Sequence, residues 1–327
     1  MFKRASMMAG CLWASTLFGC SATGDVTSGS GATAGSSTTG NSGQGGDTLF
    51  DPTGGKGGAG GAAECKNVDI LFVVDNSASM GDNQQSLINS FPGFVSAIQE
   101  KLSGAESYHI GVVTTDDYTY NDAGCTKIGN LVTKTGGIES SNSTCGPFGG
   151  GRRYLDETDS NLGDKFACIA KVGVAGNDDE RVARALLNAI DPANNGSGTC
   201  NQGFARLDSL LLVVIITDED DVPDGCESLD PPTNCLTYGS GGTPQEWYDQ
   251  VIAIKGGLPE NVVVLSLLGL SGDNSCGAQV AAKLIGFTNR FGENGYKGDI
   301  CSTSYDEFFA QTLPIIDKAC QEYVEPK

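Results

Sequence analysis

Two strongly apolar runs stand out along the chain, and each of them ends at acidic residues. The first covers residues 68–74 and leads into Asp75, and the second covers residues 210–216 and leads through Thr217 into Asp218. Runs that stop at turn-forming polar residues are typical of central strands in a parallel sheet that is covered on both faces. Because such sheets bind ligands beyond the carboxyl ends of their strands, we expect the residues after both runs to form a site.

Strands and helices alternate along the rest of the chain. An apolar stripe between residues 87 and 102 has the spacing of a helix. The other predicted elements are strands at 108–115 and 261–268 and helices at 166–172, 180–190, 244–255, 279–291 and from Ser304, with a capping box to Glu307. Two stretches rich in glycine and cysteine are expected to be insertions, at 116–162 and 222–243. The alternation predicts an α/β fold of three layers, α/β/α, with a mostly parallel central sheet.

The loop after the first apolar run carries the pattern D-x-S-x-S in Asp75, Ser77 and Ser79. Alternate residues of an extended turn point the same way, so one carboxylate and two hydroxyls can converge. The helix that we predict from Met80 adds positive potential through the amides of its first turn. Asp218 supplies a second carboxylate from another strand, and oxygen donors of this kind suit Mg2+ or Ca2+. Because hydroxyls are weak ligands, a cation held here stays under-neutralised and attracts an external carboxylate.

Ordinary strand ends are the alternative interpretation, since acidic residues are common in loops that follow strands. The second run is followed by further acids, which we expect to form a solvated loop face, with a second calcium site as the alternative. These acids are Glu219, Asp220, Asp221 and Asp224.

Together these motifs resemble the von Willebrand factor A (VWA) domain with its metal-ion-dependent adhesion site, over about residues 65–320. The strand that ends in T-D-E-D-D and the cysteine-rich insertions resemble secreted bacterial members of that family. The resemblance implies a Rossmann-like fold in which Ser77 and Ser79 ligate Mg2+ (or Ca2+ or Mn2+) directly. Asp75 and Asp218 hold the ion directly or through water, and an Asp or Glu of a partner protein completes its coordination shell.

One ligand of the family is missing from this chain. Members of the family also use a threonine on a loop between the two motifs, ahead of a helix. The corresponding stretch here is 173–181, and it contains no threonine. We expect Asn177, or else Asp178, to take its place as the fifth ligand.

The first 64 residues predict export and a tether. The basic start and the apolar stretch up to residue 19 have the length of a signal peptide and are too short for a transmembrane helix. The sequence Leu-Phe-Gly-Cys resembles a bacterial lipobox, which implies lipidation at Cys20, and Ser21 after it favours the outer membrane. The alternative is simple secretion or a periplasmic location. Residues 20–64 are mostly Gly, Ser, Thr and Ala and are expected to be a disordered tether, with the VWA-like domain at 65–327.

The cysteines support the same compartment. The chain has twelve, of which Cys11 lies in the signal peptide and Cys20 at the lipidation site. The even number that remains in an exported chain, without a C-x-x-C motif, indicates disulfides rather than zinc or a redox site. Neighbouring cysteines are the natural guesses for pairing: Cys125–Cys145, Cys168–Cys200, Cys226–Cys235 and Cys276–Cys301, with Cys65–Cys320 joining the domain ends.

The net charge of the chain and its single histidine exclude several classes of function. A formal net charge of −20 excludes nucleic acid as a partner and leaves the lipid as the means of membrane attachment. The single histidine, His109, is predicted at the amino end of a strand, opposite the site, where it cannot serve a Ser-His-Asp hydrolase. We therefore expect a monomeric, non-enzymatic surface lipoprotein that binds an acidic protein ligand through a divalent cation. The alternatives are a structural envelope lipoprotein with a degenerate site and a metal-dependent hydrolase.

Overall fold

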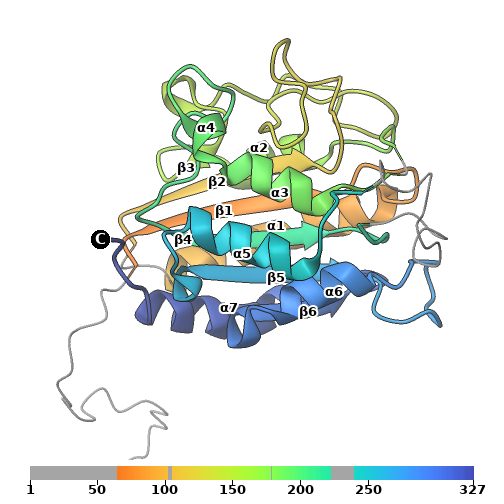
Figure 1. Cartoon of the computed structure of the whole chain (residues 1–327). Coiled ribbons are helices and arrows are strands. Elements are labelled where there is room, and N and C mark those ends of the chain that lie inside the picture. The colour runs from red at the N-terminus through yellow and green to blue at the C-terminus, as the bar shows by residue number, and fades with distance from the viewer. Residues whose placement is uncertain (1–64, 102–104, 178, 222–238) are drawn as a thin grey trace, which may run out of the picture. The chain divides into compact units, whose positions relative to one another are not determined.

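The computed structural model describes residues 65–101, 105–177, 179–221 and 239–327 (Figure 1). The predicted signal peptide, the lipidation site at Cys20 and the tether all lie outside these ranges. So do Asp178, Asp224 and the expected pair Cys226–Cys235. These predictions therefore stay predictions.

A six-stranded sheet forms the centre of the domain, in the order β3-β2-β1-β4-β5-β6. Five strands pair in parallel: β1 (Asn67–Val74), β2 (Ser107–Thr114), β4 (Leu210–Ile216), β5 (Val262–Leu268) and β6 (Gly295–Asp299). The short edge strand β3 (Leu155–Asp156) runs antiparallel to β2. The two apolar runs become β1 and β4, which are neighbours, and Val74 pairs with Ile216. Their carboxyl ends therefore meet at the same edge of the sheet.

Helices cover both faces of this sheet. They are α1 (Gly81–Lys101), α2 (Leu162–Ala170), α3 (Val182–Ile190), α4 (Pro192–Asn195), α5 (Pro244–Ile254), α6 (Ala282–Asn289) and α7 (Asp306–Gln321). Buried side chains of α1, α2 and α7 form one core with one face of the sheet, and those of α3, α5 and α6 form a second core with the other (Figure 1). The predicted three-layer α/β/α fold is confirmed.

Burial on both faces of the sheet explains why the sequence of β1 is apolar without a break after Asp69. Ile70 and Phe72 belong to the first core, whereas Leu71 and Val73 belong to the second, and all four are buried. A strand buried on both faces has no polar side from which an alternating pattern could arise. The Phe72 ring meets those of Phe91, Phe94 and Phe166, with ring centroids 4.7–6.4 Å apart.

Helix capping differs from the prediction in one place. Ser304 and Glu307 do not form a capping box: the Ser304 hydroxyl accepts a hydrogen bond from the amide of Asp306 at 3.2 Å, and α7 begins one residue later than that pattern requires. A capping box occurs instead at the start of α5. There the Thr243 hydroxyl accepts from the amide of Glu246, and the Glu246 carboxylate accepts from the amide of Thr243.

Four disulfides are present within the described residues. Cys65–Cys320 and Cys276–Cys301 are confirmed, whereas the expected pairs Cys125–Cys145 and Cys168–Cys200 are wrong. The structure pairs Cys125 with Cys200 and Cys145 with Cys168. Tertiary contacts explain the exchange. Asn201 holds the segment after Cys125 through Gly129 and Leu131, and Ser141 joins the segment before Cys145 to the carbonyl of Cys168 in α2.

Candidate metal centre

The carboxyl edge of the sheet brings four of the five predicted ligands together. The Ser77 and Ser79 hydroxyl oxygens lie 3.4 Å apart, and the Ser79 hydroxyl donates to Asp218 Oδ1 at 3.1 Å. Asp75 lies directly beneath them at the end of β1 and is fully buried. The pairing of β1 with β4 therefore places two carboxylates and two hydroxyls at one point, as the sequence predicts.

Hydrogen bonds fix the orientation of the Asp75 carboxylate. Asp75 Oδ1 accepts from the amide of Ser77 at 2.7 Å, and Oδ2 accepts from the Thr217 hydroxyl at 2.7 Å. The first bond closes a tight turn at the start of the D-x-S-x-S loop. The second ties the end of β1 to the end of β4. Both oxygens keep lone pairs free for a further bond, since a carboxylate offers about four acceptor sites.

A second loop, residues 172–177, packs against the D-x-S-x-S loop. The Gln84 side chain in α1 donates to the carbonyls of Asp75 and Gly173, both at 2.9 Å, and accepts from the Gly173 amide. The Gly176 amide donates to the carbonyl of Asn76 at 2.8 Å. A Cβ atom at Gly176 would lie 2.6 Å from that carbonyl oxygen, so the close approach of the two loops requires glycine there.

Burial leaves the carboxylates of this cluster poorly solvated. It raises the pKa of Asp75 to about 6, and the negative charge of Asp218 contributes to the rise. Burial also raises the pKa of Asp218. Both effects penalise the charged forms, and a bound cation would relieve that penalty. The electrostatics of the cluster therefore favour a positive ligand.

Asn177 does not join this cluster in the structure. It is exposed, its amide donates to Asp116 Oδ2 at 3.0 Å, and its side-chain oxygen accepts from the amide of Asp179 at 3.2 Å. That last bond is a local turn in which the side chain serves its own loop. Among the contacts of the described residues, none links Asn177 to the serines or to Asp75 and Asp218.

A carboxylate that the sequence interpretation missed lies beside the cluster. Glu180 is only 1% exposed, and neither of its carboxylate oxygens has a hydrogen-bond partner among the described residues. Burial raises the pKa of Glu180 well above its usual range, and the charge of Asp75 adds to the rise. The nearby Thr115 hydroxyl acts in the opposite direction and lowers this pKa, but its proton is donated to Asn76 Oδ1, at 3.4 Å. The sequence held one signal for Glu180: it lies inside the stretch 173–181, two residues before α3 begins.

The acids that follow Asp218 have a different role from the one expected. Asp220 and Asp221 are buried, so the prediction of a solvated loop face is wrong for both. Asp220 accepts from the amides of Lys283 and Leu284, in the first turn of α6. Asp221 accepts from the amide of Ala183 in α3 at 2.7 Å. The loop passes between the amino ends of two helices, whose free amides these carboxylates satisfy.

The donor set at the carboxyl edge fits a hard divalent cation. Two carboxylates and two hydroxyls are oxygen ligands of the kind that Mg2+, Ca2+ or Mn2+ prefer. The carboxylate of Glu180, buried and without a donor, adds a group that a cation could satisfy. Within the described ranges, no three His, Cys, Asp or Glu side chains converge as a metal site. The described residues therefore give no support to the second calcium site that was the alternative for the acids after Asp218. The fit of a cation at the carboxyl edge rests instead on a mixture of carboxylate and hydroxyl donors.

A polar groove opens beside the cluster. It has a volume of about 600 Å³, and Ser79 and Asp218 line it together with Asn83, Ser86 and the disulfide Cys276–Cys301. Its other residues come from α1 and from the two loops that this disulfide joins. A segment of a second molecule lying in this groove would pass directly over the Ser79 and Asp218 side chains.

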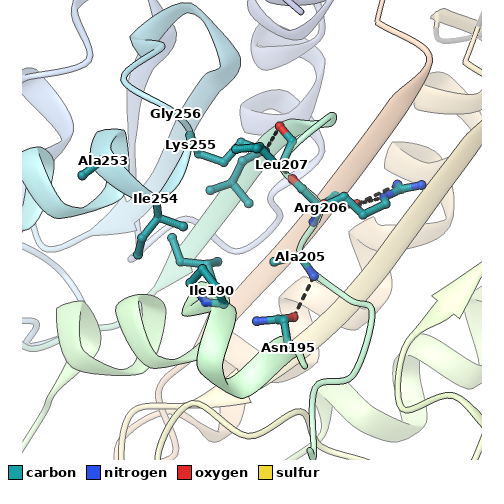
Figure 2. A pocket seen from close by; sticks show the side chains of 12 residues that line it. Ile190, Asn195, Ala205, Arg206, Leu207, Ala253, Ile254, Lys255 and Gly256 are labelled. Carbon is teal, nitrogen blue, oxygen red and sulfur yellow. Dashed lines mark hydrogen bonds and ion pairs between the residues drawn. The ribbon is translucent and has the colours of Figure 1, made fainter. Parts of the chain in front are cut away.

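A separate cavity of about 510 Å³ lies at the amino ends of the strands (Figure 2). Lys255 and Arg206 line it, but both are engaged. The Lys255 ammonium donates to the carbonyls of Arg206 and Ser209 at 2.6 and 2.7 Å, and Arg206 pairs with the buried Asp69. Asn195 bonds the amide of Ala205 at its rim (Figure 2). These contacts are a structural network that holds the start of β4.

His109 lies at the same amino side of the sheet. It is buried, its Nδ1 lies 2.8 Å from the carbonyl oxygen of Phe204, and its ring is tilted against that of Tyr154, with ring centroids 4.1 Å apart. In β2 it comes five residues before Thr114, the end of the strand at which the cluster lies. Its position therefore matches the predicted one, away from Asp75.

Comparisons with known proteins identify no family. No protein-family model and no curated protein matches the chain. Among solved structures, proximal thread matrix protein 1 from the mussel byssus shares 16% identity at a TM-score of 0.42, over 79% of this chain and 50% of that one. The pilus adhesin SpaC from Lactobacillus rhamnosus GG shares 14% at 0.38, over 79% and 31%. Human COPII-coat protein Sec24c shares 10% at 0.31, over 77% and 32%.

This chain thus spans half or less of the length of each of these proteins, and likenesses at these values carry no argument about function. A search of the described residues for membrane spans finds no helix with the length and apolar character to cross a bilayer.

Proposed function

We propose that this protein is a VWA-type binding module that holds a divalent cation, Mg2+ or else Ca2+ or Mn2+, at the carboxyl edge of its sheet and uses it to bind an acidic protein ligand. The observation that carries the proposal is the convergence of Ser77, Ser79 and Asp218 above the buried Asp75. These side chains come from two neighbouring strands, and their donors suit a hard cation.

Each residue has a distinct task in this proposal. The cation supplies a positive centre to which a carboxylate of a partner can bind. Ser77 and Ser79 present neutral oxygens toward it, and Asp218 presents a charged one. Asp75, held by Thr217 and by the Ser77 amide, supplies negative charge from below without occupying the open side. The polar groove beside Ser79 gives the partner a path to the cluster.

Export and lipid anchoring belong to the same proposal. Four disulfides within the described residues support an oxidising compartment, because such bonds are rare in reducing ones. A lipid at Cys20 would hold the domain at the outer membrane or cell surface through the segment 20–64. Secretion without a lipid is the alternative.

A second candidate function is a structural envelope lipoprotein whose site no longer binds metal. The position of Asn177 favours it, because the residue expected as the fifth ligand turns toward its own loop. The two candidates differ in a single property, which is the binding of a divalent cation.

Calorimetric titration of Mg2+, Ca2+ and Mn2+ into the purified protein, with its disulfides intact, tests the proposal. We expect one-site binding that Asp218→Asn and Ser77→Ala abolish. Asp208→Asn is the matched control, because Asp208 is exposed just before the amino end of β4, whereas Asp218 follows its carboxyl end. Absence of binding by the wild-type protein would leave the structural candidate in place.

A further inference from the structure

Glu180 has an environment that a purely structural carboxylate does not have. It is 1% exposed, and its two carboxylate oxygens are buried without a hydrogen-bond donor among the described residues. The next residue in the sequence, Arg181, does not form an ion pair with Glu180, because its guanidinium pairs with Asp179. A buried carboxylate without a partner costs several kcal/mol when ionised, so proteins seldom keep one unless it has a ligand to bind.

The backbone places Glu180 at the same edge of the sheet as the cluster. The amide of Arg181, the next residue, donates to the carbonyl of Thr115 at 3.2 Å, directly after the end of β2. Strand β2 is the neighbour of β1 on the side away from β4. Asp75 therefore lies between Asp218 on one side and Glu180 on the other, and the charge of Asp75 acts on Glu180.

We propose that Glu180 is the third carboxylate of the metal centre and fills the place that the sequence interpretation gave to Asn177. The inference rests on the proposed function, since it assigns a further ligand to the same site. The observation behind it is the unpartnered, buried carboxylate beside Asp75. In the structure the three carboxylates do not converge closely enough to hold an ion. Glu180 would therefore add its negative charge to the centre from the side of β2.

A third carboxylate changes what the centre binds. With Asp75 and Asp218 alone, the charges of the two carboxylates equal that of a divalent cation. With Glu180 they exceed it by one, so the protein itself holds the ion more tightly. Ligand charge is one of the properties that set the affinity of oxygen sites for divalent ions. The centre is therefore loaded with its cation before a partner arrives.

Titration of Mn2+ into the wild type and the variant Glu180→Gln tests the assignment. The substitution keeps the shape of the side chain and removes its charge. We expect the dissociation constant for Mn2+ to rise at least about tenfold, since even groups outside the first coordination sphere change metal affinity by about 10–100-fold. The control Glu260→Gln makes the same change at an exposed residue before β5, at the opposite edge of the sheet, and should leave affinity within about twofold.

Thermal unfolding in EDTA separates ligation from folding. Because burial already disfavours the charged form of Glu180 when no cation is bound, Glu180→Gln should have a melting temperature in EDTA that equals or exceeds that of the wild type. Glu180→Ala, which removes both oxygens, should weaken Mn2+ at least as much. Unchanged Mn2+ affinity in both variants would overturn the role of Glu180 while leaving the metal centre intact. A wild type that binds no Mn2+ would overturn the metal centre itself.

Discussion

The Ser79 hydroxyl donates a hydrogen bond to Asp218 Oδ1 at 3.1 Å, although the two residues are 139 positions apart in the sequence. The bond exists because β1 and β4 are adjacent and in register, with Val74 opposite Ile216. The loops that leave these two strands meet above the sheet, and their polar side chains can serve one ligand.

The contact between Thr217 and Asp75 should matter for stability as well as for metal binding. Thr217→Val keeps the shape of the side chain but removes the hydroxyl that donates to the buried Asp75 Oδ2. Leaving a buried carboxylate oxygen without its donor costs about 1–3 kcal/mol. Urea denaturation in EDTA should show that loss in the free energy of unfolding. Thr303→Val, at an exposed position, is the control and should change it by less than about 0.5 kcal/mol.

Asp220 should behave as a helix cap. Its carboxylate accepts from two amides at the start of α6, so Asp220→Ala should lower the free energy of unfolding by about 0.5–2 kcal/mol. The affinity for Mg2+ should stay as in the wild type, since the amides at the start of α6 engage both oxygens of this carboxylate. A large loss of Mg2+ binding in this variant would mean that Asp220 is a ligand, and that the two helix contacts are secondary.

Asp221 should make stability depend on pH in a defined direction. Burial raises the pKa of Asp221 to about 6 in the folded protein, against the usual 3.8. Between those two values the folded state holds a proton that the unfolded state has lost. Its contribution to stability is therefore full below about pH 4 and declines as the pH rises through about 6.

The difference between the wild type and Asp221→Asn isolates this effect, because asparagine does not titrate. In EDTA, the free energy of unfolding of the wild type should fall by about 1–3 kcal/mol more than that of the variant between pH 4 and pH 7. Chemical denaturation at both pH values measures it. Parallel behaviour of the two proteins would show that Asp221 ionises normally in the fold.

The disulfides should differ in their effect on stability according to the length of chain that they close. Cys65–Cys320 spans 255 residues and Cys145–Cys168 spans 23. In the chain-entropy model the first should contribute about 5 kcal/mol and the second about 3 kcal/mol. Replacing each pair by serine and measuring chemical denaturation tests the order. Mass spectrometry of unreduced peptides tests the pairing itself, and a Cys125–Cys145 peptide would contradict the structure.

Much of the fold could be predicted from the sequence because β1 and β4 are buried on both faces and their apolar runs have no other explanation. The D-x-S-x-S motif and Asp218 could also be predicted from the sequence, since both follow those strands. The position of Glu180 was not, because its importance lies in the absence of a partner, which only tertiary structure reveals. The same holds for Asp220 and Asp221, whose partners are amides of distant helices.

The pairing of Cys125 with Cys200 shows a related limit. Sequence separation favours Cys145 as the partner of Cys125, and it fails because loop residues such as Asn201 bring distant segments together. The edge strands β3 and β6 were missed for another reason. They are short, and β6 carries two glycines and two charged residues, a composition that does not suggest a strand.

The central claim is that a divalent cation binds between the two serines and Asp218. Crystals of the protein grown with Mn2+, measured at a wavelength where manganese scatters anomalously, test it most directly. We expect one strong anomalous peak at the carboxyl edge of the sheet, within about 2.0–2.4 Å of the Ser77 and Ser79 hydroxyl oxygens. A map with no peak there, from crystals soaked at saturating Mn2+, would contradict it.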